Sequence, residues 1–357
     1  MTERHPQSSP FTSAPERVPH LMGSVMLALA PATVWGVLVF GWPALFLLVV
    51  TVGSALIWEA ICLRLAGKPA RFYLYDGSAL LSGWLLAMSL PPWAPWWIGC
   101  FGAFLAIVVG KQVYGGIGQN LFNPAMLARI ALLVSFPLEM TTWVNPSPWF
   151  SSHSPGFLES LSIVFGHSSI DAYSGATAIG GMKTALTQGI LPGDTLAKTF
   201  SLAMALFGYS GGSLGETSEV LILGGGLWLL RKKIVTWHIP VSLLGTLAVL
   251  AGFAHLVDGA RYPGPLFHLA SGGAMLTAFF IATDYVTSPN TRIGQLIFGA
   301  GCGLLIYVIR TFGGYPEGAG FAVLLMNAAT PLIDHYVRPR IYGRDRKGRP
   351  LELDHER

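Results

Sequence analysis

Charged residues are scarce in this chain of 357 amino acids. Only 11% are Asp, Glu, Lys or Arg, whereas soluble domains carry about 25%, and none lies between Gly77 and Gly110. Hydrophobic residues make up 52% of the chain, and the mean hydropathy is +0.54. These values exclude an ordinary soluble domain. Because the apolar runs are continuous and approach the roughly 20 residues that a membrane-crossing helix needs, we predict an all-α membrane protein.

Cysteine is scarce as well. The three cysteines, Cys62, Cys100 and Cys302, stand singly in apolar runs, and the nine histidines lack the spacing of metal ligands. We therefore expect buried free thiols, and neither a metal nor an iron–sulfur site in this chain. Residues 1–20 are polar and lack the short apolar core and cleavage site of a removable signal peptide.

The apolar runs predict about ten transmembrane helices. They lie at about residues 21–40, 44–64, 77–91, 93–111, 124–140, 214–231, 236–257, 266–284, 292–311 and 318–335. The first five form one predicted bundle half, residues 21–140, and the last five form the other, residues 200–335. Residues 141–199 between the halves are polar and contain Ser, Gly and Pro, so we expect a long exposed loop, which in a compact protein is usually functional or disordered.

Lysine and arginine cluster next to the predicted spans. The clusters are Arg64, Lys68 and Arg71; Arg231, Lys232 and Lys233; and the basic tail of residues 336–357. Positive residues favour the cytoplasmic side, and with ten spans all three clusters fall on one face. We predict a bacterial inner-membrane protein with both termini in the cytoplasm and the 141–199 loop in the periplasm. The net charge of +4 comes mostly from these anchors, so no nucleic-acid partner is expected.

The two bundle halves contain similar stretches. Residues 82–88 (SGWLLAM) match 277–283 (TAFFIAT), residues 110–116 (GKQVYGG) match 309–314 (IRTFGG), and residues 123–127 (NPAML) match 324–328 (LLMNA). The copies are five spans apart, and an odd offset reverses their orientation, so an inverted five-helix repeat is predicted. Such folds hold their sites at the repeat interface, near interrupted helices. The alternative is chance similarity among Gly-rich apolar segments.

The 141–199 loop contains a pattern for covalent flavin attachment. The stretch DAYSGAT, from Asp171 to Thr177, fits Asp-x-x-(Ser/Thr)-Gly-(Ala/Ser)-Thr, in which a flavin transferase esterifies the last Thr with the phosphate of FMN. Thr177 supplies the hydroxyl, while Gly175 and Ala176 let a modifying enzyme approach closely. Ser174 can hold a turn, and Asp171 can orient the hydroxyl or bind a metal of that enzyme. The alternative is a flexible Ser/Gly/Ala turn.

Two acidic residues in predicted spans are candidates for an ion pathway, because ionisable groups at membrane depth are costly and often functional. Asp284 lies near the end of the 266–284 run, where a cap or an interfacial anchor is the alternative. Glu59 lies in the 44–64 run, close to its positively charged end at Arg64.

The segment around residues 115–126 is rich in Gly and amides. Gln119, Asn120 and Asn123 could hydrogen-bond the edge of a flavin ring or a quinone-like headgroup, and Arg129 could pair with a flavin phosphate. A re-entrant turn that packs two helices is an equally good interpretation. Glu216 follows Ser213 at the spacing of a capping box.

Several stretches resemble the D subunit of Rnf-type ion-translocating oxidoreductase complexes. They are residues 76–80 (DGSAL), 115–126 (GGIGQNLFNPAM), 174–177 (SGAT), 212–218 (GSLGETS) and 279–284 (FFIATD). The resemblance runs from about residue 20 to the tail at residues 338–340. The homologous B subunit of sodium-pumping NADH:quinone reductases is similar too, but the modest N-terminal extension and the basic tail favour the Rnf version.

The resemblance implies a membrane subunit of a complex that exchanges electrons between ferredoxin and NAD while it moves Na⁺ or H⁺. It implies FMN on Thr177, a second, non-covalent flavin (riboflavin) as in some members, and partner subunits that bear flavins and iron–sulfur centres. Tyr285 stands where the family commonly has Pro, which puts the local helix break in question. The alternatives are a passive channel for a neutral solute, which needs no flavin, and a scaffold subunit with an unmodified Thr177.

Overall fold

The computed structural model describes residues 18–151, 154–166, 174–175, 177–188, 200–315 and 317–339. These residues are predominantly helical, with one pair of short strands, β1 (Trp143–Val144) and β2 (Ser174–Gly175). The helices of the first half are α1 (Val18–Leu65), α2 (Ala70–Leu74), α3 (Ser78–Ser89), α4 (Trp96–Phe104), the π-helix η1 (Leu105–Val109), the 3₁₀ helix η2 (Gln112–Tyr114), α5 (Pro124–Ser135) and α6 (Pro137–Thr141).

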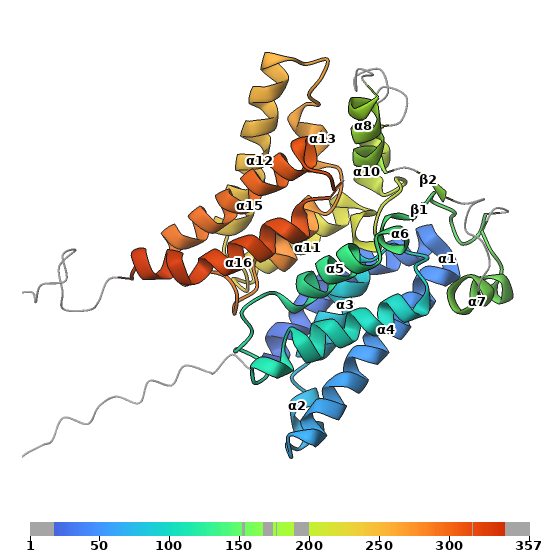
Figure 1. Cartoon of the computed structure of the whole chain (residues 1–357), viewed down its shortest axis with the longest axis vertical. Helices are drawn as coiled ribbons and strands as arrows, with labels where there is room; N and C mark the ends of the chain where they lie inside the picture. Colours follow the sequence, from blue (N-terminus) through green and yellow to red (C-terminus); the bar gives the residue numbers. More distant parts are fainter. Residues whose placement is uncertain are drawn as a thin grey trace, which may run out of the picture.

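The connecting region contains α7 (Phe157–Phe165), α8 (Ala178–Thr187) and α10 (Leu202–Phe207). The second half consists of the 3₁₀ helix η3 (Leu214–Glu216), α11 (Glu219–Arg231), α12 (His238–Val257), α13 (Pro265–Leu269), α14 (Ala274–Leu276), the π-helix η4 (Thr277–Ile281), α15 (Arg292–Phe312) and α16 (Ala319–Tyr336). The two halves occupy different regions of the molecule, and α5 of the first half packs against α16 of the second (Figure 1).

Among the described residues, four helical segments are long and apolar enough to cross a membrane: Val18–Leu65, Trp96–Tyr114, His238–Val257 and Arg292–Phe312. Val18–Leu65 has 48 residues and covers two of the predicted runs. The chain is therefore a multi-pass membrane protein. Each of the ten predicted ranges contains helix, but the count of ten membrane crossings and the inverted repeat remain predictions.

A break at Gly41 divides α1 into two arms. Gly41 has φ 73°, in the left-handed region that suits glycine. The break leaves carbonyl groups at the end of the first arm without helical partners. The indole nitrogen of Trp93 donates to the Phe40 carbonyl at 2.9 Å, and the backbone N–H of Ser147 donates to the Val39 carbonyl at 3.1 Å. Trp93, between α3 and α4, and Ser147 of the connecting region therefore cap the break in the first helix.

Four predicted spans differ from continuous helices. In the 214–231 run, Thr217 and Ser218 separate η3 from α11. The 266–284 run is interrupted between α13 and α14, where Gly272 has φ 67°. The 124–140 run breaks at Phe136, the residue before Pro137, because a residue that precedes proline is disfavoured in the helical conformation. The 77–91 run forms only the 12 residues of α3 and ends before the two prolines that follow.

Small residues allow the closest helix contacts. A Cβ atom on Gly299 or Gly303 of α15 would collide with backbone carbonyls of α12, and a Cβ atom on Gly225 of α11 would collide with the Ala28 carbonyl of α1. Glycine at such positions lets helix backbones approach within a membrane. These contacts hold α12 against α15 and join the second half to α1.

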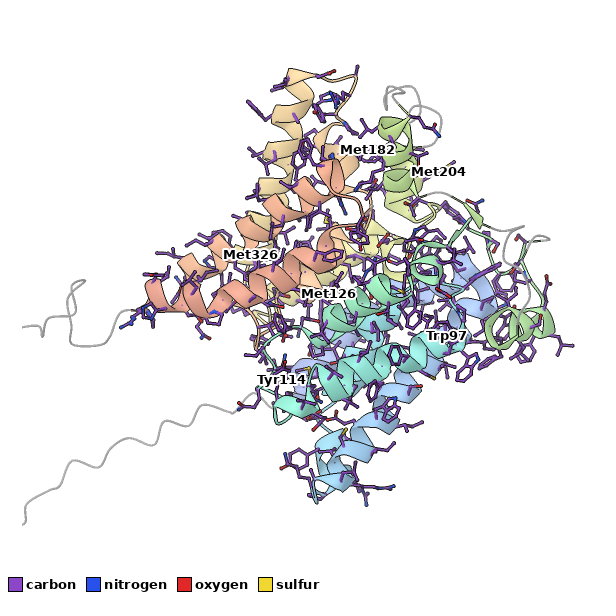
Figure 2. The ribbon with its side chains drawn as sticks, in the orientation of Figure 1. Trp97, Tyr114, Met126, Met182, Met204 and Met326 are labelled. Atoms are coloured by element: carbon purple, nitrogen blue, oxygen red, sulfur yellow. The ribbon has the colours of Figure 1, made fainter. Side chains whose placement is uncertain are left out.

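The connecting region sits at one end of the bundle. Strands β1 and β2 pair antiparallel, with Trp143 opposite Gly175. Ile179 and Met182 of α8 pack on Phe267 of α13 in a small cluster that is separate from the main core. Figure 2 shows Met182 of α8 and Met204 of α10 at the same end of the molecule.

Candidate functional site

Thr177 is the N-cap residue of α8. Its backbone is extended (φ −69°, ψ 157°), and its hydroxyl accepts a hydrogen bond from the Gly180 N–H at 3.0 Å. Threonine is a preferred N-cap residue because its side chain satisfies one of the free N–H groups at a helix start. The side chain is half-buried. The predicted attachment residue therefore has a defined position at the start of a helix.

The rest of the predicted motif is described in part. Ser174 and Gly175 form β2, and a Cβ atom on Gly175 would collide with the Asn145 carboxamide beyond β1. The strand pairing therefore supplies a packing reason for glycine, besides the access that the sequence suggested. Asp171 and Ala176 lie outside the described residues.

Thr177 lines an open pocket of about 920 Å³, which we call the Thr177 pocket. Its walls come from β1 and the residues after it, the start of α8, residues 200–211 and the break between α13 and α14. Aromatic and amide side chains (Trp143, Asn145, Phe200 and Tyr209) line it together with the carboxylates of Glu216 and Glu317. The pocket therefore combines an aromatic lining with two carboxylates, Glu216 and Glu317, which we call its acidic floor.

Each of these two carboxylates belongs to a buried ion pair. Arg310 donates to both oxygens of Glu317, at 3.1 and 3.2 Å, and to the His268 carbonyl at 2.7 Å. Nη2 of Arg129 lies 3.8 Å from Oε1 of Glu216. Burial raises the pKa of Glu317, but Arg310 and Arg129 outweigh it and hold that pKa below its ordinary value. Breaking such a pair leaves an uncompensated buried charge, which is strongly destabilising.

The predicted capping box at Ser213 is confirmed. Glu216 accepts from the Ser213 N–H at 3.4 Å at the start of η3. The same carboxylate also faces Arg129, which additionally donates to the Ser89 carbonyl. Arg129 thus pairs with a carboxylate that lines the Thr177 pocket, and its pairing with a flavin phosphate stays a prediction.

Lys183 fastens α8 to the end of α15. Its ammonium donates to the carbonyls of Ile309 at 3.0 Å and Gly313 at 2.7 Å, and also to that of Tyr315. Burial lowers the pKa of Lys183, and the Glu317 carboxylate opposes this shift. Lys183 was not among the residues predicted from the sequence, although it stands six residues after Thr177 on the same helix.

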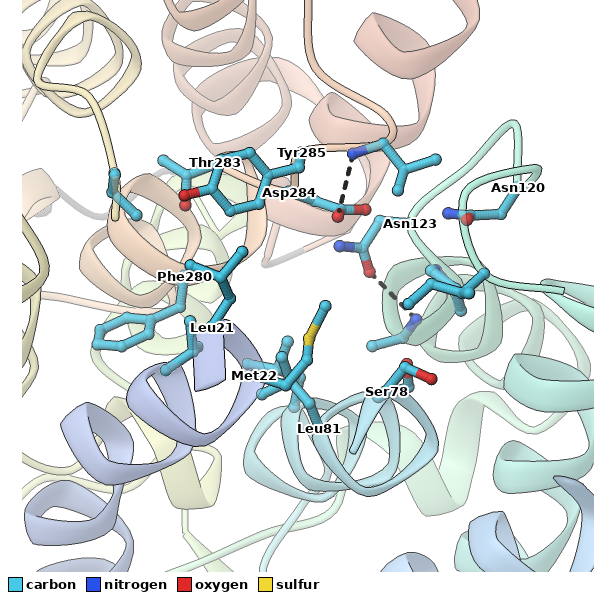
Figure 3. A pocket seen from close by; sticks show the side chains of 18 of the residues that line it. Leu21, Met22, Ser78, Leu81, Asn120, Asn123, Phe280, Thr283, Asp284 and Tyr285 are labelled. Atoms are coloured by element: carbon cyan, nitrogen blue, oxygen red, sulfur yellow. Dashed lines mark hydrogen bonds between the residues drawn. The ribbon is translucent and has the colours of Figure 1, made fainter. Parts of the chain in front are cut away.

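A second pocket, of about 820 Å³, brings three other predicted residues together. Asn120, Asn123 and Asp284 line it, along with Ser78 and Lys111; we call it the Asn123 pocket. Figure 3 shows Asn123 and Asp284 across the cavity from Met22 of α1 and Leu81 of α3. The Asn123 pocket lies where residues from both bundle halves meet.

Asn123 is the N-cap residue of α5. Its side-chain oxygen accepts from the N–H groups of Ala125 and Met126, at 3.1 and 3.2 Å, and its amide nitrogen donates to the Ile281 carbonyl of η4 at 3.3 Å. Its own backbone N–H donates to the side chain of Asn327. The Asn123 side chain thus joins the two halves.

The neighbouring amides differ in exposure. Asn120 is buried and donates to the Phe122 carbonyl at 3.1 Å, whereas Gln119 is exposed and does not line the Asn123 pocket. Gly115, Gly116 and Gly118 all have positive φ, so this segment turns sharply between η2 and α5.

Asp284 closes the turn after η4. Its carboxylate accepts from the Val286 N–H at 3.4 Å and from the Thr287 hydroxyl at 3.1 Å. These bonds give Asp284 a local structural role in a turn, and its part in an ion pathway stays a prediction. The helix break also persists with Tyr285 in place of proline, because η4 ends at Ile281 and turns follow.

Glu59 has a partner that was not predicted from the sequence. Lys111 donates to its Oε1 at 2.7 Å and to the Ser78 hydroxyl at 2.7 Å, and the side chains of Glu59 and Lys111 are each 3% exposed. Lys111 follows the long uncharged run that ends at Gly110. A lone charged residue next to a long apolar run needs a buried partner, so the position of Lys111 in the sequence could have predicted an ion pair.

Cys302 is buried, Cys62 and Cys100 are half-buried, and all three are free thiols. Within the part of the chain that the structure describes, no group of three or more His, Cys, Asp or Glu side chains could hold a metal ion.

Comparison with known proteins identifies the family of this chain. The family model described as NQR2, RnfD, RnfE matches residues 5–343. The D subunit of the ion-translocating oxidoreductase complex of Halorhodospira halophila is 54% identical over 98% of both chains. The D subunits of the same complex from Stutzerimonas stutzeri and Rhodobacter capsulatus are 57% and 48% identical, over 94% and 85% of both chains. This chain belongs to the NQR2, RnfD and RnfE family.

Proposed function

We propose that this protein is the D-type membrane subunit of an ion-translocating oxidoreductase complex and carries FMN as a phosphoester on Thr177. The name of the relatives supports the assignment to such a complex. The observation that carries the cofactor proposal is the position of Thr177. Its half-buried hydroxyl starts a helix and lines a pocket of about 920 Å³.

The residues around Thr177 fit a phosphoester and a planar ring. A phosphate on this hydroxyl would lie at the N-terminus of α8, where free N–H groups and the helix dipole favour an anion. Cofactor pockets commonly combine an apolar or aromatic lining with a few polar groups. Trp143, Phe200 and Tyr209 supply aromatic surface, and Asn145 supplies an amide. FMN, when bound, supplies the redox chemistry.

The Asn123 pocket is the proposed site of the second, non-covalent flavin, a riboflavin. Its lining contains the aromatic rings of Phe279 and Phe280 and the amide of Asn120, groups that can stack on and hydrogen-bond a planar heterocycle. Lys111 also lines the pocket, with its ammonium paired to Glu59.

The proposed activity of the whole complex is electron transfer between ferredoxin and NAD coupled to the movement of Na⁺ or H⁺. Moving one charge against roughly 100 mV costs about 2.3 kcal/mol, and about 59 mV shifts a one-electron equilibrium tenfold. A drop of roughly 100 mV per electron therefore balances one ion. Asp284 and Glu59 stay candidates for the ion pathway, and coupling needs an element with two states of similar free energy.

The proposed setting is a bacterial inner membrane, with both termini cytoplasmic, the Thr177 region periplasmic and ten spans in an inverted repeat. Lys111 and Arg310 support the repeat, because they occupy matching positions of the two similar stretches and each pairs with a carboxylate of its own half. The proposed partners are flavin-bearing and iron–sulfur subunits, and a flavin transferase for maturation.

The test is covalent flavin on a denaturing gel. The protein is expressed with a flavin transferase, and ultraviolet fluorescence is compared for wild type, Thr177→Ala and Thr187→Ala, the last being a matched control on an exposed threonine of the same helix. We expect fluorescent bands from wild type and Thr187→Ala and a dark band from Thr177→Ala. A dark wild-type band, with the transferase active on another substrate, would rule out the covalent flavin and favour a passive channel for neutral solutes.

A B-type subunit of a sodium-pumping NADH:quinone reductase is the second candidate, because the family description covers that group too. Oxidation of ferredoxin with NAD as acceptor by the purified complex would favour the D-type assignment. Reduction of quinone by NADH would favour the B-type.

A further inference from the structure

Lys183 lies on the helix that begins at Thr177, and all three N–H donors of its ammonium group form hydrogen bonds. An ammonium has three N–H donors, and Lys183 donates to three backbone carbonyls, those of Ile309, Gly313 and Tyr315. All three acceptors belong to the end of α15 and the residues that follow it. One side chain thus joins two segments about 130 residues apart in the sequence.

The acceptors suit a cation for a general reason. The last carbonyls of a helix have no partners within the helix, and the helix dipole makes this end negative. Ile309 lies in the last turn of α15, and Gly313 is its C-cap residue. Lys183 therefore satisfies carbonyls that would otherwise need water or another donor.

The other attachments of α8 are small. Ile179 and Met182 pack on Phe267 in a cluster separate from the main core, and the chain before α8 is held by the two-residue pairing of β2 with β1. Hydrogen bonds to charged groups contribute more than neutral ones. The contacts of Lys183 are thus a large part of what holds this helix in place.

The fastening point is also next to the floor of the Thr177 pocket. Arg310 directly follows Ile309 and pairs with Glu317, and Glu317 lines the pocket that Thr177 also lines. A helix fixed at this point keeps its first residue facing that pocket.

We propose that Lys183 is a positioning residue, which holds α8 on the C-terminal end of α15 so that the group attached to Thr177 stays in the Thr177 pocket. This rests on the proposed attachment of FMN to Thr177. The docking of α8 itself does not depend on the cofactor and can be measured separately.

Cysteine labelling tests the docking without any flavin. In the intact complex, with Cys62, Cys100 and Cys302 replaced by alanine, one cysteine is placed at buried Ala185 or, as a control, at exposed Thr184 of the same helix. With Lys183 present, we expect Ala185→Cys to react with a maleimide much more slowly than Thr184→Cys. With Lys183→Met, the rate at position 185 should rise about tenfold or more, while the rate at 184 stays unchanged.

Lys183→Arg provides the rescue, because a guanidinium retains several donors. Protection of position 185 should largely return in this variant. Met182→Cys, at a second buried position, repeats the measurement if Ala185→Cys does not fold. Equal protection of the buried cysteine with Lys183 and with Lys183→Met would overturn the proposal.

Iodide quenching of the attached flavin supplies the second readout. Lys183→Met should keep the fluorescent gel band, because Thr177 is intact, but iodide should quench its flavin several-fold more strongly than in wild type and Lys183→Arg. If Lys183→Met gives a bright band with unchanged quenching and unchanged labelling, the positioning role of Lys183 is refuted, while the flavin on Thr177 stands. A dark wild-type band with labelling that depends on Lys183 would refute the flavin at Thr177 and leave the docking role in place.

Discussion

The Thr177 pocket and the Asn123 pocket have similar volumes but are built differently. The Asn123 pocket lies where α1, α3, α5 and η4 meet, and Asn123 is tied by hydrogen bonds to both bundle halves. The Thr177 pocket is closed on one side by α8, whose apolar contacts form a small separate cluster. The Asn123 pocket is thus part of the core, whereas the Thr177 pocket is completed by α8, a helix attached to the outside of the core.

This difference bears on how each pocket would keep a ligand. A preformed pocket in the core can retain a ligand by fit alone, because its walls lose little entropy on binding. A pocket with an attached wall gains more from a covalent bond, which keeps the ligand at the site even when that wall moves. The hydroxyl that the motif singles out lies on the attached element.

The largest expected difference between the pockets is in covalent flavin. Thr177→Ala should abolish the fluorescence of the denatured protein, whereas Asn123→Ala should leave it unchanged, because only Thr177 offers the hydroxyl that is esterified. Gel fluorescence normalised to protein measures both. Loss of the band in Asn123→Ala, despite normal protein levels, would contradict the independence of the two sites.

The ion pairs near the two pockets should differ in their effect on stability. Arg310→Met should destabilise by about 3–5 kcal/mol, because Arg310 is fully buried and binds Glu317 and the His268 carbonyl. Lys111→Met should cost somewhat less, since Lys111 makes one bond to Glu59 and one to Ser78. The melting temperature in detergent reports both. The double variant Lys111→Met, Glu59→Gln should recover part of the lost melting temperature. If it recovers none, the ion pair between Lys111 and Glu59 does not account for the loss.

A smaller effect is expected from the cap of α5. Asn123→Ala removes an N-cap side chain, which typically costs about 0.5–2 kcal/mol, and also the bond to the Ile281 carbonyl. Asn123→Asp keeps the acceptor for Ala125 and Met126 but cannot donate to Ile281. We therefore expect the melting temperatures to rank wild type, Asn123→Asp and Asn123→Ala from highest to lowest. An equal loss in both variants would assign the effect to the bond with Ile281.

The smallest effect concerns pH at the Thr177 pocket. Glu317 lies between α15 and α16, and its pKa is held below the ordinary value of 4.5 by Arg310 and Arg129 against the effect of burial. Its contribution to stability is therefore present above about pH 4.5 and is lost as the pH falls through the lowered pKa. The melting temperature should drop in that acidic range in wild type, and the drop should be smaller in Glu317→Gln. Identical pH curves would contradict this contribution.

Local pattern predicted much of this molecule correctly. The helical character, the family and the capping box at Ser213 follow from apolar runs, short motifs and fixed spacings. Each depends on residues that are close together in the chain, or on stretches long enough to identify a family.

Contacts between distant residues were beyond such patterns. Asn123 and Asn327 are 204 positions apart and form a hydrogen bond, and the partner of Glu59 lies 52 positions away. Arg129 is close to Gln119 and Asn120 in the sequence, but its partner in the fold is distant. The side chain of Arg129, on α5, lies instead next to Glu216, which lines the Thr177 pocket.

Composition alone makes this a helical membrane protein, because its apolar runs can satisfy their backbone groups in lipid only as helices or closed barrels, and they lack the alternation of strands. The motif residues likewise identify Thr177 without any structure. The pairing of charges and the attachment of α8 depend on the packed fold, because each buried charge takes whichever partner the helix packing brings within reach. Only that packing places Lys183 at the end of α15 and Thr177 beside Glu216 and Glu317.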